Sequence, residues 1–179
     1  MRPFRARRPG GGLSVALPFP LAGIHQVGIV VRDLDRAMRA YWEGFRIGPW
    51  RVYTYGAPLV KDMTYRGRRQ DFCMRIALTQ AGPTIVELIE SVEGPNIYEE
   101  FLREHGEGIH HVMSIVEDFD LALERMAAAG YPLIQSGRGF GADGSGGYAY
   151  FDTIADLGLI LELVEVPRVR VPPDRVYPP

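Results

Sequence analysis

The chain has 179 residues with a formal net charge of −2, and 46% of the residues are hydrophobic. That is enough apolar material for one compact domain or two small fused modules. A charge near zero excludes a chain built mainly to bind nucleic acid, because phosphate binding needs a concentrated basic surface. No apolar stretch approaches the ~20 residues of a membrane-spanning helix, and the single cysteine, Cys73, cannot form an internal disulfide, so a cytoplasmic location is expected.

Residues 1–21 are expected to form a disordered or extended tail, because arginines precede the glycine run 10–12. A targeting signal is the alternative. Its apolar segment, 13–21, is short and broken by Pro18 and Pro20, which makes it a poor signal core.

The rest of the chain predicts two βαβββ units within one domain, residues 22–167. Aspartates at 33 and 118 follow apolar runs and stand where helix N-caps are favoured. For the first module, 22–92, the expected elements are a strand at 24–31, a helix at 34–45 and strands near 50–55, 72–79 and 84–90. A short helix at 96–105 leads to the second module, 107–167, with a strand at 109–116, a helix at 119–129 and strands near 132–135, 147–152 and 159–165.

Two further segments fall outside this pattern. The glycine-rich stretch 137–147 lacks the lysine of a nucleotide-binding loop and is expected to be a mobile lid. The proline-rich arm 168–179 is expected to wrap the surface or to cross to a partner subunit. Aromatic residues near the second strand, Trp42, Trp50, Tyr53 and Tyr55, are explained equally well by a pocket or by core packing.

The two units share short motifs that carry ligand-capable side chains. The motif Ile24-His25-Gln26-Val27 recurs as Ile109-His110-His111-Val112, and Val86-Glu87-Leu88 recurs as Leu161-Glu162-Leu163. Because strand residues alternate between faces, Gln26 and His111 are expected on the concave face, with His25 and His110 turned toward the helices. Ligand-type residues at matched positions of a duplication indicate one metal site built between the halves.

These motifs, together with the run Gly106-Glu107-Gly108-Ile109-His110-His111, resemble the vicinal oxygen chelate superfamily, the group of glyoxalases, bleomycin-resistance proteins and extradiol dioxygenases. The stretch 94–102 leading into that run is most similar to methylmalonyl-CoA epimerases. The resemblance covers residues 22–167. It implies an α+β fold in which two paired βαβββ modules form a curved, cup-shaped mixed sheet with helices outside.

The resemblance also implies one divalent ion in the cup, bound by Gln26, Glu87, His111 and Glu162. Epimerases usually carry histidine at the first of these positions, whereas some glyoxalase I enzymes carry glutamine. This oxygen-rich donor set suits Zn²⁺, Co²⁺, Ni²⁺, Mn²⁺ or Mg²⁺. A single inward histidine argues against an iron oxygenase, which needs two histidines and a carboxylate.

An open divalent site can stabilise an enolate, so a base beside it can remove a proton α to a carbonyl. By resemblance to glyoxalase I, Glu162 would shuttle that proton, and Glu87 is the other candidate catalytic carboxylate. An epimerase needs a second acid or base, and Asp71 is the only carboxylate near the third strand of the first module. A turn residue is the simpler interpretation of Asp71.

The sequence therefore predicts a divalent-metal-dependent isomerase or epimerase that acts through an enolate on a small acyl-CoA or carbonyl substrate. Two alternatives stay open: a glyoxalase I-like lyase, which glutamine at position 26 favours, and a ligand-binding or resistance protein of the same fold. Four ligand-capable positions count against the last. A small-molecule substrate is expected as the partner, without nucleic acid or membrane, and the open sheet edges of each half predict a homodimer.

Overall fold

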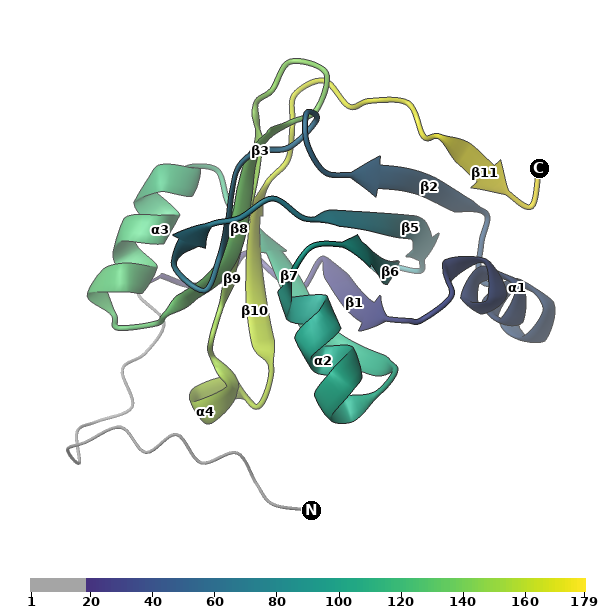
Figure 1. The fold of residues 1–179 in the computed structure, drawn as a ribbon, viewed down its shortest axis with the longest axis horizontal. Helices are drawn as coiled ribbons and strands as arrows, with labels where there is room; N and C mark the ends of the chain where they lie inside the picture. The colour runs from purple at the N-terminus through teal and green to yellow at the C-terminus, as the bar shows by residue number, and fades with distance from the viewer. Residues whose placement is uncertain (1–18) are drawn as a thin grey trace.

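The computed structural model describes residues 19–179 as one eleven-stranded sheet with four α-helices (Figure 1). The strands of the first half and its helix are β1 (Gln26–Val30), α1 (Leu34–Phe45), β2 (Trp50–Tyr55), β3 (Lys61–Tyr65), β4 (Arg68–Arg69), β5 (Cys73–Ala81) and β6 (Thr84–Glu93). The remaining elements are α2 (Ile97–His105), β7 (Gly108–Ile115), α3 (Phe119–Ala128), β8 (Leu133–Phe140), β9 (Gly146–Phe151), α4 (Ile154–Leu157), β10 (Ile160–Glu165) and β11 (Arg175–Tyr177). No helix in this part of the chain is long and apolar enough to span a membrane.

The strand order, β11-β2-β5-β6-β1-β7-β10-β9-β8-β3-β4, contains the predicted duplication. In each half the first strand pairs in parallel with the last, β1 with β6 and β7 with β10, and the halves join where β1 pairs antiparallel with β7. The expected α+β fold of two paired βαβββ modules is therefore confirmed. The helix predicted at 34–45 coincides with α1, and Asp33 caps it by accepting a hydrogen bond from the Arg36 amide at 2.8 Å.

The alternation of side chains along the strands separates two outer hydrophobic clusters from an inner one. Helix α1 covers the outer face of the first module and α3 that of the second. The buried members of the two outer clusters are Val31, Leu34, Ala37, Met38, Trp50, Val52, Ala77 and Leu88 in the first, and Phe119, Ala122, Met126, Tyr131, Ala149, Phe151, Leu161 and Leu163 in the second. Helix α2, which connects the modules, instead packs Ile97, Tyr98 and Leu102 into the inner cluster.

Each outer edge of the sheet is extended by a segment from the opposite half. The β3–β4 hairpin lies beyond β8 of the second module, and β11 from the C-terminus lies beyond β2 of the first. These additions were not among the predicted elements, because 61–69 and 175–177 are short, polar and without a clear apolar alternation. The sheet edges that motivated the expected homodimer are thus paired within one chain, and the dimer itself stays a prediction.

Two other expectations from the sequence concern the lid at 137–147 and the N-terminal tail. The stretch 137–147 is not a loop lid, since most of it belongs to β8, β9 and the turn between them, and its glycines let large side chains approach the backbone. At Gly137 an added Cβ would lie 2.6 Å from the Tyr148 ring. Of the expected N-terminal tail, residues 1–18 lie outside the described residues, while Phe19 and Leu21 pack against the outer cluster under α3.

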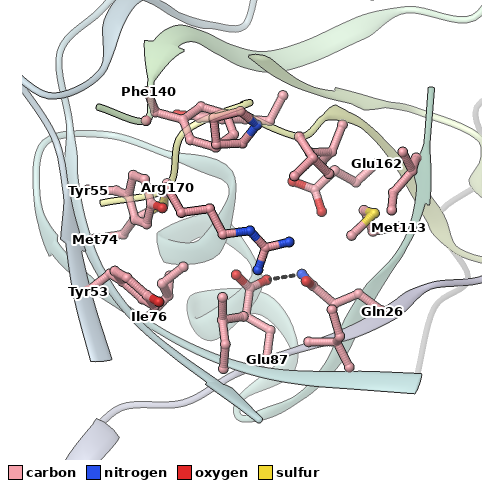
Figure 2. A pocket seen from close by; sticks show the side chains of 18 of the residues that line it. Gln26, Tyr53, Tyr55, Met74, Ile76, Glu87, Met113, Phe140, Glu162 and Arg170 are labelled. Atoms are coloured by element: carbon pink, nitrogen blue, oxygen red, sulfur yellow. Dashed lines mark hydrogen bonds between the residues drawn. The ribbon is translucent and has the colours of Figure 1, made fainter. Parts of the chain in front are cut away.

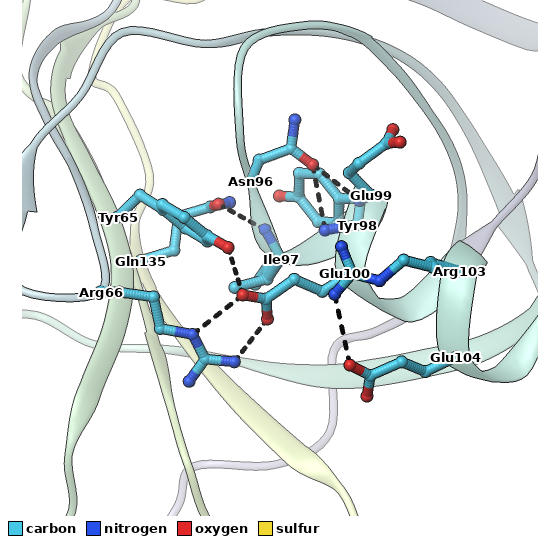
Figure 3. A network of polar contacts seen from close by, with 10 residues as sticks. All are labelled: Tyr65, Arg66, Asn96, Ile97, Tyr98, Glu99, Glu100, Arg103, Glu104 and Gln135. Atoms are coloured by element: carbon cyan, nitrogen blue, oxygen red, sulfur yellow. Dashed lines mark hydrogen bonds and ion pairs between the residues drawn. The ribbon is translucent and has the colours of Figure 1, made fainter.

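The β3–β4 hairpin is fastened to the start of α2 by the network drawn in Figure 3. Tyr65 and Arg66, at the hairpin turn, both donate hydrogen bonds to the Glu100 carboxylate. On the same side, Gln135 of β8 accepts a hydrogen bond from the Ile97 amide at 3.0 Å, and Asn96 caps the helix. Although burial raises the pKa of Glu100, Arg66 and Tyr65 outweigh it and hold that pKa below its ordinary value.

We expect Glu100→Gln to lower the free energy of unfolding by about 1 kcal/mol near pH 7, because a partly exposed charge-assisted network is lost. A carboxyl whose pKa is lowered by folding stabilises the fold above its unfolded pKa, and that contribution disappears as the pH falls through the folded pKa. The difference in the free energy of unfolding between the variant and the native chain should therefore shrink below about pH 4.5. Urea unfolding at pH 7 and pH 3 measures this difference, with Glu104→Gln as the control, since Glu104 is exposed and pairs with its neighbour Arg103 at the surface. An equal loss at both pH values would contradict the role of the charge.

Candidate metal centre

Four neighbouring strands at the centre of the sheet bring the sequence-predicted ligands together. Gln26 lies on β1, Glu87 on β6, His111 on β7 and Glu162 on β10, and each is at most 6% exposed. Their positions follow from strand register, because Gly28 lies opposite both Glu87 and His111. The alternation predicted from the sequence thus holds for all four side chains, which point to the concave side of the sheet.

The side-chain ends meet at short distances. Gln26 Nε2 donates a hydrogen bond to Glu87 Oε2 at 2.7 Å, and His111 Nε2 lies 3.5 Å from that oxygen and 3.2 Å from Glu162 Oε2. One ligand atom from each of Glu87, His111 and Glu162 falls within 4.8 Å of the others. Despite this proximity, His111 Nε2 and Glu162 Oε2 have no hydrogen-bond partner among residues 19–179.

The buried carboxylates of this cluster favour a positive charge between them. Burial alone would lower the pKa of His111, but the negative charge of Glu162, followed by Glu87, raises it to about 9 when no ion is present. Burial raises the pKa of Glu87, and repulsion from Glu162 adds to the rise against the opposing effect of His111. A divalent ion would compensate two converging carboxylates that are otherwise costly to bury.

These features fit the divalent ion that the fold implies. His111 would supply Nε2, Glu87 and Glu162 would supply carboxylate oxygens, and Gln26 would supply its amide oxygen, since its nitrogen is directed at Glu87. One imidazole and three oxygen donors suit Zn²⁺, Co²⁺, Ni²⁺, Mn²⁺ or Mg²⁺. The fit is supported by the buried His111 Nε2 and Glu162 Oε2 atoms, which have no hydrogen-bond partner among the described residues.

His110 faces a helix as predicted, but that helix is α2, where its ring centroid lies 5.5 Å from that of Tyr98 and 5.1 Å from that of Phe101, and not α1 or α3. Consecutive residues Gly28 and Ile29 of β1 lie opposite His111 and Ile109 of β7, so His110 is the extra residue of a β-bulge. The bulge lets two adjacent histidines approach the inner cluster, where Nδ1 of His110 lies 3.0 Å from Nδ1 of His111. Burial, followed by the neighbouring His111, lowers the pKa of His110 well below its ordinary value, so a neutral His110 can accept the Nδ1 proton of His111. That hydrogen bond leaves Nε2 of His111 free to bind a metal.

Gly28 is required by the position of the His111 ring. A Cβ added at Gly28 would lie 2.0 Å from His111 Cε1, and the ring is completely buried. We therefore expect Gly28→Ala to displace His111 and weaken divalent-metal binding at least tenfold, the size of effect seen when a ligand is misoriented. Calorimetric titration measures it. Gly44→Ala is the control, because nothing lies within 4 Å of the added Cβ at Gly44. Unchanged metal affinity in Gly28→Ala would contradict the placement of His111 in the site.

Gln26, Glu87 and Glu162 line a cavity whose walls are otherwise largely apolar and aromatic (Figure 2). Tyr98 donates a hydrogen bond to the Tyr150 hydroxyl at 2.8 Å, and the buried Tyr148 hydroxyl has no partner among the described residues. The lining includes Tyr53, Tyr55, Met74, Ile76, Leu78, Ile85, Tyr98, Met113, Ile115, Phe140, Tyr148, Tyr150, Val164, Val166 and Val171. The site therefore combines polar donors with room for an apolar substrate portion.

The sequence predicts only part of this lining. Tyr53 and Tyr55 line the cavity, whereas Trp50 is buried in the outer cluster under α1. Tyr148 and Tyr150 were missed, although alternation within β9 puts them on one face and Tyr150 pairs directly with Glu162 in the sheet. Asp71, the candidate second acid or base, is exposed and does not line the cavity, so its interpretation as a turn residue is the better one.

Comparison with known proteins agrees with this architecture. The family model described as the glyoxalase/bleomycin resistance protein/dioxygenase superfamily matches residues 25–151. A methylmalonyl-CoA epimerase from Mycobacterium tuberculosis is similar in structure, with a TM-score of 0.61 and 24% sequence identity over 87% of this chain and 94% of that one. A variant of the Streptomyces coelicolor methylmalonyl-CoA epimerase in complex with 2-nitronate-propionyl-CoA also gives a TM-score of 0.61, with 19% identity over 86% of this chain and 100% of that one.

A search of curated proteins finds no match. The similarity to the solved epimerases shows the shared fold, and the family model covers more than half of the sequence. The resemblance found in the sequence motifs is confirmed: the chain belongs to the glyoxalase/bleomycin resistance protein/dioxygenase superfamily, whose fold is that of the vicinal oxygen chelate proteins.

Proposed function

We propose that this chain is a divalent-metal-dependent epimerase or isomerase that removes and returns a proton next to the carbonyl of a small acyl-CoA or carbonyl compound. The observation that carries the proposal is the buried group of Glu87, His111 and Glu162, of which both carboxylates line a largely apolar and aromatic cavity. The epimerases of the same fold, one of them in complex with 2-nitronate-propionyl-CoA, support it.

A divalent ion held by this group would stabilise the negative charge that develops on the substrate oxygen when the α-proton leaves. Glu162 is the base we propose, because its Oε2 atom is buried, lacks a hydrogen-bond partner among residues 19–179 and faces the cavity. An epimerase also needs proton transfer on the second face of the substrate. Glu87 is the one other carboxylate that lines the described cavity, so we assign it that step.

A second function is favoured by one residue, Gln26. Its amide contacts Glu87, and glutamine at this place is the feature shared with some glyoxalase I enzymes. A glyoxalase I-like lyase would use the same proton transfer on the adduct of a thiol with an aldehyde. A protein that only binds ligands would instead bring the four polar side chains together without using them for proton transfer.

Solvent deuterium incorporation distinguishes these functions. The metal-loaded chain is incubated in D₂O with methylmalonyl-CoA and, separately, with the hemithioacetal of glutathione and methylglyoxal, and the products are followed by NMR. We expect exchange at the α-carbon of the acyl-CoA, abolished by a chelator and restored by about one equivalent of metal. Conversion of the hemithioacetal alone would establish the lyase, and no exchange with either compound would reject an enzymatic role toward both classes.

A further inference from the structure

The C-terminal residues 167–177, here called the C-terminal strap, cross from one module to the other and are fastened at both ends. At the first end, the Ala142 amide donates to the Val169 carbonyl at 2.8 Å, and the Arg168 amide donates to Ser145 Oγ at 2.9 Å. Pro167 packs so closely on the β8–β9 turn that a Cβ at Gly141 would lie 2.3 Å from it. This end of the strap is therefore fixed to the second module.

The other end is fixed to the first module. The Asp174 amide donates to the Val52 carbonyl at 2.8 Å, β11 pairs antiparallel with β2, and Arg175 forms an ion pair with Asp35 of α1. The four residues between the two fastenings, 170–173, include two consecutive prolines that restrict the backbone. Arg170 and Val171 of this span line the cavity, so the strap forms part of its wall.

Arg170 puts a positive charge into this cavity. Figure 2 shows its guanidinium extending from the strap toward Glu87 and Gln26. Across the described lining the charged residues are Arg170, Glu87 and Glu162. The guanidinium forms no hydrogen bond or ion pair within residues 19–179, so its five N–H donors are available to a ligand.

The balance of charge indicates what that ligand is. With a divalent ion bound, the charges of Glu87 and Glu162 are compensated, and Arg170 leaves the cavity with one unbalanced positive charge. A guanidinium binds planar or tetrahedral oxyanions through two parallel hydrogen bonds, which ammonium groups cannot imitate. Neutral carbonyl compounds would leave this group unpaired.

We infer that Arg170 is a specificity-determining residue that selects substrates carrying an oxyanion, a carboxylate or phosphate group, close to the carbon from which the proton is removed. This inference rests on the proposed function for the identity of the reacting carbon, but the anion selectivity itself depends only on the strap and the cavity. The side chain enters the cavity from the C-terminal arm, which the repeated modules do not include.

Binding of small probes tests the inference. The metal-loaded chain is titrated by calorimetry with malonate, with phosphonoacetate and with the neutral analogue malonamide. We expect Arg170→Met to weaken malonate or phosphonoacetate binding by about 10- to 100-fold and to leave malonamide binding unchanged. Arg170→Lys should recover only part of the loss, because it restores the charge without the planar pair of donors. The oxyanion with the larger loss is the group that Arg170 prefers.

The matched control is Arg168→Met, which removes the same charge from the same strap. Arg168 is 81% exposed and pairs with Asp143 outside the cavity lining, so binding of all three probes should stay as in the native chain. Equal affinity for the anions in native and Arg170→Met chains, equal losses for malonate and malonamide, or no anion binding by the native chain would overturn the inference.

The anion-binding test of Arg170 and the deuterium-exchange test of the proposed function can succeed or fail separately. Charge-selective binding that depends on Arg170, without deuterium exchange on any substrate, would support the anion site and reject the enzymatic assignment. Exchange that proceeds with KM values unaffected by Arg170→Met, for charged and neutral thioesters alike, would support the enzyme and overturn the role of Arg170.

Discussion

Replacing His111 by alanine is expected to abolish stoichiometric binding of a divalent ion and, with it, proton exchange by this chain. His111 is the one imidazole whose Nε2 lies beside both carboxylates, 3.5 Å from Glu87 and 3.2 Å from Glu162. Loss of an outer partner of a metal ligand already costs about 10- to 100-fold in affinity, so loss of the ligand should exceed that. Two buried carboxylates would also face each other without their histidine.

Metal content after dialysis and calorimetric titration measure this effect. His105→Ala is the control, because His105 lies exposed at the end of α2 and outside the cavity lining. Circular dichroism shows whether the variant keeps its secondary structure. A folded His111→Ala chain that still bound one equivalent of metal with native affinity would contradict the assignment of the site.

Glu162→Gln should separate the binding role from the catalytic one. An amide oxygen can still coordinate the ion, so much of the metal should remain bound, but the variant lacks the carboxylate that we propose as the base for the first proton transfer. Removal of a general base costs about 10²- to 10⁴-fold in rate. We therefore expect the rate of deuterium exchange to fall by at least about 10²-fold while the metal content changes little.

Exchange rates with matched metal content test this second prediction. Glu165→Gln is the control on the same strand, because Glu165 lies outside the cavity lining. If Glu162→Gln kept full turnover with bound metal, the proton would have to be moved by Glu87, since Asp71 is exposed and lies outside the cavity.

The strand alternation around Gln26 and His111 made the centre of this fold predictable. Apolar residues on the opposite face of β1, such as Val27 and Ile29, indicate which side of the strand packs under a helix. Because the unit is duplicated, the equivalent face of β7 follows from that of β1. The helix boundaries were predictable for a similar reason, because aspartate caps and amphipathic spacing are local signals.

Features that depend on distant partners could not be predicted. The β3–β4 hairpin is held by β8 and by Glu100, and β11 by β2, none of which is adjacent in sequence. The bulge at His110 breaks the alternation without any glycine or proline at that position to mark it. The place of Arg170 in the cavity could not be predicted, because in the sequence it is one charge in a proline-rich segment. It lines the cavity because the C-terminal strap crosses there.

Anomalous diffraction from crystals of the metal-loaded chain, recorded at the absorption edge of Co²⁺ or Zn²⁺, locates the bound ion. We expect one strong peak per chain, within about 2.0–2.2 Å of His111 Nε2 and of carboxylate oxygens of Glu87 and Glu162, with the Gln26 amide oxygen turned toward it. A metal-saturated crystal with no peak among these four side chains, or with its peak elsewhere on the chain, would contradict the assignment of these residues as the metal site.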